Sequence, residues 1–114
     1  MVLSSLVALI HVYIFALESV FWTSPYGRKV FGNDPTEAEA TRVLAQNQGV
    51  YNLCLTAGIF WGLASGAELV PRTSAFLLYV AIAGVVGAAT ASVRILFVQT
   101  VPAVLALAAL WLGR

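Results

Sequence analysis

Two side chains in the first hydrophobic stretch could take part in acid–base chemistry, the imidazole of His11 and the carboxyl group of Glu18. On a helix, a separation of seven residues is two turns, so they share a face but lie about 10 Å apart along the axis. They cannot touch each other directly. A charge at the centre of a membrane-spanning helix costs about 2.5–3.5 kcal/mol, so ionisable residues there are functional candidates. If the protein is an enzyme, we expect Glu18 and His11 to be its catalytic groups.

Carboxamide side chains in the later hydrophobic stretches are further candidates. Asn47, Gln48 and Asn52 each cost free energy in hydrocarbon unless another part of the protein meets their hydrogen bonds, so we expect them to face other helices. The predicted ligand-binding residues are Asn47, Gln48, Tyr51, Asn52, Arg94 and Gln99.

The sequence predicts no metal site, because one histidine and one acid two turns apart do not supply the usual ligand set. It contains no Ser-His-Asp arrangement, glycine-rich phosphate loop or paired-cysteine motif, and it leaves any cofactor unknown. Cys54, the single cysteine, is expected to be a small core residue. The net charge of +1 comes from scattered basic residues, which argues against a nucleic-acid partner.

Composition indicates the setting of these side chains. The 114 residues are 61% hydrophobic and 10% charged, with a mean hydropathy of +0.91. A chain this apolar is predicted to be an all-α integral membrane protein. Since a span needs roughly 20 apolar residues, the length allows at most about four spans with short connections. We therefore expect one transmembrane domain over residues 1–114, a four-helix bundle with spans at about 2–23, 45–66, 74–91 and 95–112.

The first span is read as an uncleaved helix, because no basic segment or small-residue cleavage site precedes its polar residues. Breakers in Ser24–Asn33 then predict a polar connection. Asp34, Pro35 and Glu37 have the spacing of a helix start with a capping box. The second helix is thus expected to be long, running from Pro35 to Gly66 over about 48 Å at 1.5 Å per residue.

Small residues predict how the later helices pack. Gly58, Gly62 and Gly66 recur every fourth residue, so another backbone can lie against that face. A second such stripe is expected at Ala81, Gly84, Ala88 and Ala91. A turn is predicted at 67–73, a break near 92–94, and a bend at Pro102, which frees the carbonyl of Val98.

Basic residues predict the orientation. The side with the first and third loops carries Arg28, Lys29, Arg42 and Arg94, against Arg72 and Arg114 on the other, so the first side is expected in the cytoplasm and both termini outside. The alternation of the helices then places Glu18, Asn47, Asn52 and Gln99 in the same leaflet, with His11 deeper. Such groups could line a polar pocket open to the cytoplasmic leaflet.

Three motifs carry a family resemblance: His11-x-Tyr13-Ile14-x-x-Leu17-Glu18-x-x-x-Trp22, Asn47-Gln48-Gly49-x-Tyr51-Asn52, and Gln99-x-x-Pro102-Ala103. They resemble the small bacterial membrane family known as domain of unknown function thirteen-oh-four, over nearly the whole chain. The resemblance implies a location in the bacterial inner membrane, and it implies no biochemical activity.

A more distant likeness is to the membrane-associated proteins in eicosanoid and glutathione metabolism, which have four helices, a long second helix and a cytoplasmic first loop. Arg42 and the segment from Gln48 to Asn52 could correspond to that family's glutathione-binding motif, with Tyr51 in place of its glutamate. The likeness implies a homotrimer with sites between subunits, and a dimer remains open.

Three functions stay open at this stage. The leading hypothesis is a membrane protein that binds or acts on a small amphiphile in the polar pocket. The second is a small transporter in which protonation of Glu18 is coupled to substrate movement. The third is a structural subunit without a ligand. The sequence does not decide between enzyme, transporter and structural protein.

Overall fold

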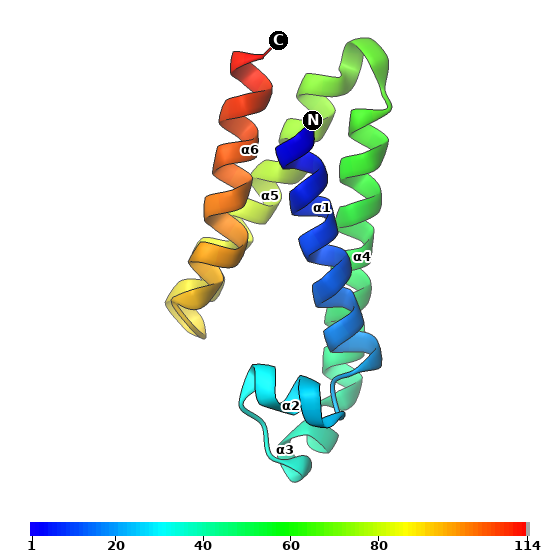
Figure 1. The fold of residues 1–114 in the computed structure, drawn as a ribbon, viewed down its shortest axis with the longest axis vertical. Coiled ribbons are helices and arrows are strands. Elements are labelled where there is room, and N and C mark those ends of the chain that lie inside the picture. The colour runs from blue at the N-terminus through cyan, green and yellow to red at the C-terminus, as the bar shows by residue number, and fades with distance from the viewer. Residues whose placement is uncertain (114) are drawn as a thin grey trace. The chain divides into compact units, whose positions relative to one another are not determined.

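A computed structural model describes residues 1–113, and within that range every regular element is a helix. The all-α prediction is therefore confirmed for the described chain. The elements in order are α1 (Val2–Phe15), π-helix η1 (Ala16–Val20), α2 (Pro25–Phe31), α3 (Pro35–Ala40), α4 (Arg42–Leu63), 3₁₀-helix η2 (Gly66–Glu68), α5 (Leu69–Thr90), π-helix η3 (Leu96–Thr100) and α6 (Val101–Leu112). Figure 1 labels the α-helices.

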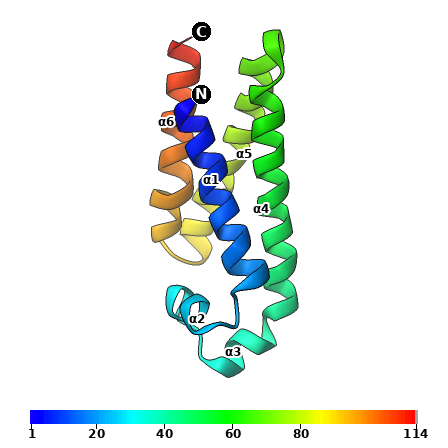
Figure 2. The same ribbon diagram turned by 45° about the vertical axis from the view of Figure 1, so that its right-hand side comes forward.

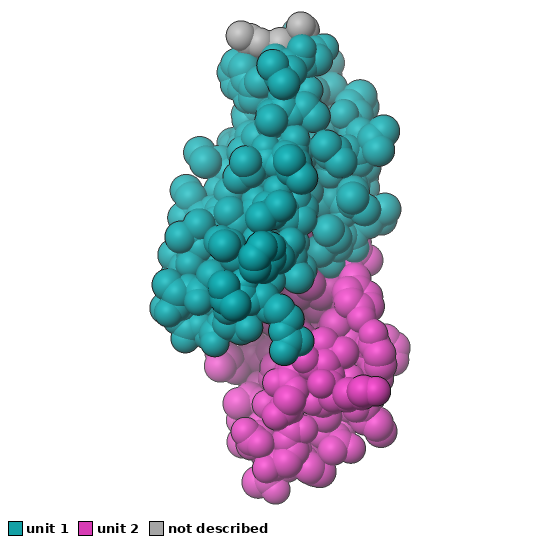
Figure 3. Space-filling view, turned by 60° about the vertical axis from the view of Figure 1, so that its left-hand side comes forward, with its two compact units in different colours: residues 1–10, 55–114 teal, residues 11–54 magenta. Residues whose placement is uncertain are grey.

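The chain divides into two compact units, which Figure 3 distinguishes by colour. Unit 1 comprises Met1–Ile10 and the chain from Leu55 onward, and unit 2 comprises His11–Cys54. The boundaries fall inside α1 and α4, so each of these helices contributes to both units.

The core of unit 1 is made by apolar residues from four helices. Val7 of α1 and Ile59 of α4 lie in one cluster with Leu77 of α5 and Ala106 of α6, and all four are fully buried. The small side chains of α6, Ala103 and Ala106 among them, allow close packing against α5. Thr56 of α4 adds a buried hydrogen bond, its hydroxyl donating to the carbonyl of Ala8 at 2.9 Å.

The glycine stripe of α4 behaves as predicted at two positions and differently at the third. A Cβ atom at Gly62 would lie 2.8 Å from the backbone nitrogen of Thr73, so α4 and α5 meet there with no side chain between them. Gly58 faces the ring of Phe76. Gly66 contacts nothing within 4 Å; its φ of 59° is that of a turn residue, which suits glycine, so the contact predicted there is wrong.

In unit 1, α5 and α6 form an antiparallel hairpin through the turn after Thr90, which confirms the break predicted near 92–94 (Figures 1 and 2). Gly84 of α5 lies against the backbone of Thr100, as the second small-residue stripe predicted. This approach lets the Thr100 hydroxyl donate to the Ala81 carbonyl at 2.9 Å. The segment before Pro102 is a π-helix, whose wider turn accommodates a residue that has no N–H to donate.

Helix α5 begins at Leu69, with Pro71 in its first turn, so the turn predicted over 67–73 is mostly helical. The prediction was wrong because proline is compatible with the first turn of a helix. The N–H group that proline lacks would have no partner inside the helix at that position. The same reason applies in unit 2, where the predicted connection Ser24–Asn33 contains α2. Ser24 caps this helix and Pro25 is its first residue, while Gly32 ends it in the left-handed conformation.

The predicted long second helix is interrupted at Thr41, which separates α3 from α4. Its predicted start is confirmed: the Asp34 side chain accepts from the Glu37 amide at 2.8 Å, and the Glu37 side chain accepts from the Asp34 amide at 3.2 Å. The break lies where the indole N–H of Trp22 is 3.1 Å from the Ala38 carbonyl and 3.0 Å from the Thr41 hydroxyl. A side chain that engages a backbone carbonyl in this way competes with the helical hydrogen bond.

Two helical stretches of the described chain, Val2–Val20 and Gly66–Thr90, are long and apolar enough to cross a membrane. A shorter apolar helix spans Leu96–Leu112.

Candidate functional site

The π-helix η1 sets the position of Glu18. In this segment the amide of Phe21 donates to the carbonyl of Ala16 at 2.9 Å, five residues earlier, so the turn is wider than an α-helical one. A π-turn inserts one residue into a helix and changes the direction of the side chains around it, and such turns are frequent at functional sites. Glu18, at the centre of the turn, is half-buried.

In unit 2 the carboxyl group of Glu18 meets Asn52 of α4. The Asn52 side-chain amide donates to Glu18 Oε1 at 2.7 Å and to the carbonyl of Gln48 at 3.1 Å. Both acceptors need an N–H donor, so the carboxamide nitrogen of Asn52, and not its oxygen, must face them. This network therefore fixes the orientation of the Asn52 side chain. One atom of each partner, Oε2 of Glu18 and Oδ1 of Asn52, accepts no hydrogen bond from any described residue.

A close approach of η1 to α4 makes this contact possible. The Ser19 hydroxyl donates to the carbonyl of Gln46 at 3.1 Å. Gly49 lies directly against Ser19, and a side chain there would collide with its hydroxyl oxygen. Gly49 and Asn52 lie on the face of α4 that contacts η1, and Asn52 is three residues on, so it stands next to Glu18.

Sequence reasoning found Glu18 and Asn52 but missed Ser19 and Gly49. A signal was present, because Ala45, Gly49, Asn52 and Thr56 follow the alternating spacing of four and three residues that marks one face of a helix. Ala45, Gly49 and Thr56 are buried. Read in this way, the motif around Asn47 would have pointed to Gly49 as the contact residue and to Asn52 as the polar group beside it.

The other predicted ligand residues of α4 lie on its exposed surface. Asn47, Gln48 and Tyr51 are all exposed, with Tyr51 60% accessible. Asn47 and Tyr51 are four residues apart and share a face that differs from the one carrying Gly49 and Asn52. The expectation that the carboxamides face other helices is thus met by Asn52, whereas within the single chain Asn47 and Gln48 do not follow it.

Cys54 also lies away from the packed face, two residues on from Asn52. It is exposed, so its prediction as a core residue is wrong. The hydrophobic neighbours that suggested burial are themselves exposed in part, Leu53 at 41% among them.

His11, the first residue of unit 2, is buried, with 1% of its surface accessible. Elsewhere in unit 2, a hydrogen bond between the hydroxyl groups of Tyr13 and Tyr26 joins α1 to α2. The pair of Glu18 and Asn52 itself contains one titratable group. It can bind a cation or carry a proton, and a two-group acid–base mechanism would need His11 or a group brought by the ligand.

Arg94 and Gln99 belong to unit 1. Arg94 is exposed, and Gln99 is half-buried within the π-helix η3. Two of the predicted site residues, Glu18 and Gln99, therefore lie in π-helical turns. Whether Arg94 and Gln99 join Glu18 in one site stays a prediction.

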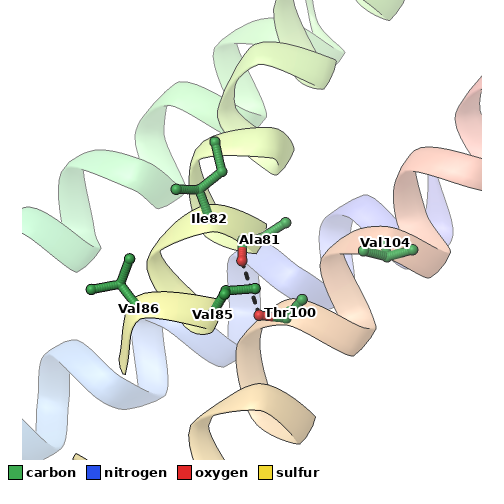
Figure 4. A pocket seen from close by; sticks show the side chains of 6 residues that line it. All are labelled: Ala81, Ile82, Val85, Val86, Thr100 and Val104. Atoms are coloured by element: carbon green, nitrogen blue, oxygen red, sulfur yellow. Dashed lines mark hydrogen bonds between the residues drawn. The ribbon is translucent and has the colours of Figure 1, made fainter. Parts of the chain in front are cut away.

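A pocket of about 310 Å³ lies in unit 1, between α5 and the η3–α6 segment (Figure 4). Its lining residues are Ala81, Ile82, Val85, Val86, Thr100 and Val104. Figure 4 shows the Thr100 hydroxyl turned to the Ala81 carbonyl, so the one polar side chain of the lining is engaged. With no titratable group, this pocket suits hydrocarbon and offers no acid–base chemistry.

Comparison with known proteins gives the family. Residues 5–111 match the model of the family described as "Protein of unknown function (DUF1304)", and the chain belongs to that family. The chain is 30% identical over 108 residues to the uncharacterized protein YpaA of Lactococcus lactis subsp. lactis. The aligned region covers 93% of this chain and 91% of the relative. No solved structure matches. The likeness to the eicosanoid and glutathione proteins therefore stays a hypothesis from the motifs.

Proposed function

We propose that this protein is a multi-pass membrane protein of the bacterial inner membrane that binds, or acts on, a small amphiphile at Glu18 and Asn52. The observation that carries the proposal is the carboxyl group of Glu18, half-buried in a π-turn and held by Asn52 at 2.7 Å. It lies in Val2–Val20, one of the two stretches apolar and long enough to cross a membrane. The proposed bundle has four spans, which adds to these two stretches the spans predicted at about 45–66 and 95–112.

A structural role alone would not need this carboxyl group. Two carboxamides, or a hydroxyl and a carbonyl as in the Thr56–Ala8 contact, join helices without the cost of an ionisable group in hydrocarbon. In the proposal, the pocket opens to the cytoplasmic leaflet and both termini are outside, while a contribution of Asn47, Gln48, Tyr51, Arg94 and Gln99 to its polar lining stays a prediction. The exposed carboxamides of α4 would be covered by headgroups or by a second subunit, in a trimer as the distant likeness implies or in a dimer.

Mass spectrometry of co-purified amphiphiles tests the proposal. We would purify the wild type, Glu18→Gln and, as a matched control, Glu68→Gln, which alters an exposed acid of unit 1. We expect at least one amphiphile to accompany the wild type and Glu68→Gln and to fall at least about tenfold in Glu18→Gln, as loss of a charge-assisted hydrogen bond predicts. Equal amphiphile content in all three proteins, with all three folded, would leave the structural-subunit hypothesis.

The transporter hypothesis uses the same carboxyl group as a proton carrier. It predicts in addition that movement of the identified amphiphile across a vesicle membrane depends on a proton gradient, which binding alone does not.

A further inference from the structure

The atoms that Glu18 and Asn52 leave without partners indicate the chemistry of the ligand. Resting on the proposed function, we infer that the amphiphile carries a primary ammonium head group, which donates hydrogen bonds to Oε2 of Glu18 and Oδ1 of Asn52.

Hydrogen-bond capacity gives the first argument. Both N–H groups of the Asn52 carboxamide are directed to protein acceptors, Glu18 Oε1 and the Gln48 carbonyl. With the Glu18 carboxyl group ionised, what the pair has left is acceptor capacity only, on one carboxylate oxygen and one amide oxygen. The neighbouring Ser19 hydroxyl donates to Gln46, so it does not supply a donor either. A head group that donates several hydrogen bonds suits this arrangement, and an anionic head group, which only accepts, does not.

Charge gives the second argument. Besides the imidazole of His11, the basic side chains of unit 2 are Arg28, Lys29 and Arg42, and none of these three forms an ion pair with Glu18. Arg42 pairs with Glu39 at 3.2 Å, while Arg28 lies close enough to Asp34 to help lower the pKa of that carboxyl group. The half-buried Glu18 carboxylate thus has a neutral hydrogen-bond donor, and no arginine or lysine of its own unit forms an ion pair with it. A ligand ammonium would supply the opposite charge and, with up to three N–H groups, the missing donors.

Matched ten-carbon probes test the inference. We would place the wild type, Glu18→Gln and Glu68→Gln in phosphatidylcholine nanodiscs, whose lipid carries no primary amine. Apparent affinities for decylamine, decanol and decanoate follow from the shift of the thermal unfolding midpoint with probe concentration. Lysophosphatidylethanolamine, compared with lysophosphatidylglycerol, shows whether the ammonium can come from a lipid head group rather than a free amine.

We expect decylamine to bind the wild type and Glu68→Gln at least tenfold more tightly than decanol or decanoate. In Glu18→Gln the preference should fall below twofold. Glu18-dependent binding of lysophosphatidylethanolamine would identify a lipid head group as a source; its absence, with decylamine bound, would identify free amines.

The comparison within the wild type decides the inference even if Glu18→Gln does not fold. Decanol or decanoate bound as tightly as decylamine would overturn the ammonium assignment. The proposed function would still stand if the co-purified amphiphile depended on Glu18, and it would fall with the inference if no amphiphile did.

Discussion

At the scale of single residues, the contact between Glu18 and Asn52 is the feature on which the account depends. Its partners were selected from the sequence by type, because carboxyl and carboxamide groups are costly in hydrocarbon. Which carboxamide would meet the carboxyl group depended on the rotation of α4 about its axis. Gly49 determines that rotation through its contact with Ser19, so Asn52 approaches Glu18 while Asn47 is exposed.

A double-mutant cycle should detect this contact. With Glu18→Ala and Asn52→Ala, measured singly and together by unfolding in bilayer-like micelles, we expect a coupling of about 0.6 kcal/mol, the average for hydrogen bonds between membrane helices, and at most about 1.7 kcal/mol. Asn52→Ala combined with Glu68→Gln serves as control and should be additive within about 0.3–0.5 kcal/mol. Equal coupling in both cycles would contradict the contact between Glu18 and Asn52.

The cap of α3 gives a prediction on pH. The pKa of the Asp34 carboxyl group is lowered, chiefly because the backbone N–H of Glu37 donates to it, with a smaller contribution from Arg28. Because the folded pKa is below the unfolded value of about 3.9, the stabilisation is complete above that value and is lost as pH falls through the folded pKa. The Glu37 amide should therefore stay protected from hydrogen exchange at pH 5 and lose protection below the folded pKa. Asp34→Asn, which caps without titrating, should remove the pH dependence.

At the scale of elements, local signals and long-range contacts had different value for prediction. The capping box of α3 was readable because its partners are three residues apart. Pro25 and Gly32 were read as breakers, although the same residues start and end α2. The break at Thr41 depends on Trp22, 19 residues away, so no local pattern around Thr41 reveals it. The π-turns also had no sequence signal except Pro102 after η3.

The contact of α4 with α5 at Gly62 should not tolerate a side chain. A Cβ atom there would lie 2.6–2.9 Å from atoms of Thr73, two of them in the backbone, so Gly62→Leu must separate the helices. We expect a loss of about 1–3 kcal/mol or more, or failure to fold, measured as the thermal unfolding midpoint in detergent. Ala57→Leu, at an exposed position of the same helix, is the control. An unchanged midpoint for Gly62→Leu would contradict this packing.

At the scale of the whole molecule, hydropathy alone predicted an all-helical chain with membrane-spanning stretches. Two stretches of the described chain, Val2–Val20 and Gly66–Thr90, are long and apolar enough to cross a membrane. The proposed four-span topology adds α4, whose carboxamides and Arg42 lower its hydropathy, and the short helix that ends at Leu112. These two spans are predicted from the length of the chain and from the apolar character of α5 and α6, which would have to reverse direction within a bilayer.

Cysteine labelling tests the topology. Cys54 would first be replaced by serine, and a single cysteine placed at Lys29, an exposed residue of α2. Because the positive-inside rule places this segment in the cytoplasm, an impermeant thiol reagent should label it only after the membrane is opened. A cysteine at exposed Gly113 serves as control and should react in intact cells. Labelling at position 29 in intact cells would reverse the assignment.

The most direct test of the central claim is an experimental structure of the protein in lipid, at a resolution that shows small molecules beside Glu18. The account predicts elongated non-protein density whose head lies within hydrogen-bond distance of Oε2 of Glu18 and Oδ1 of Asn52. A guanidinium group of Arg94, or any other protein side chain, in contact with that carboxylate oxygen would show that Glu18 has a structural partner and would contradict the proposed function.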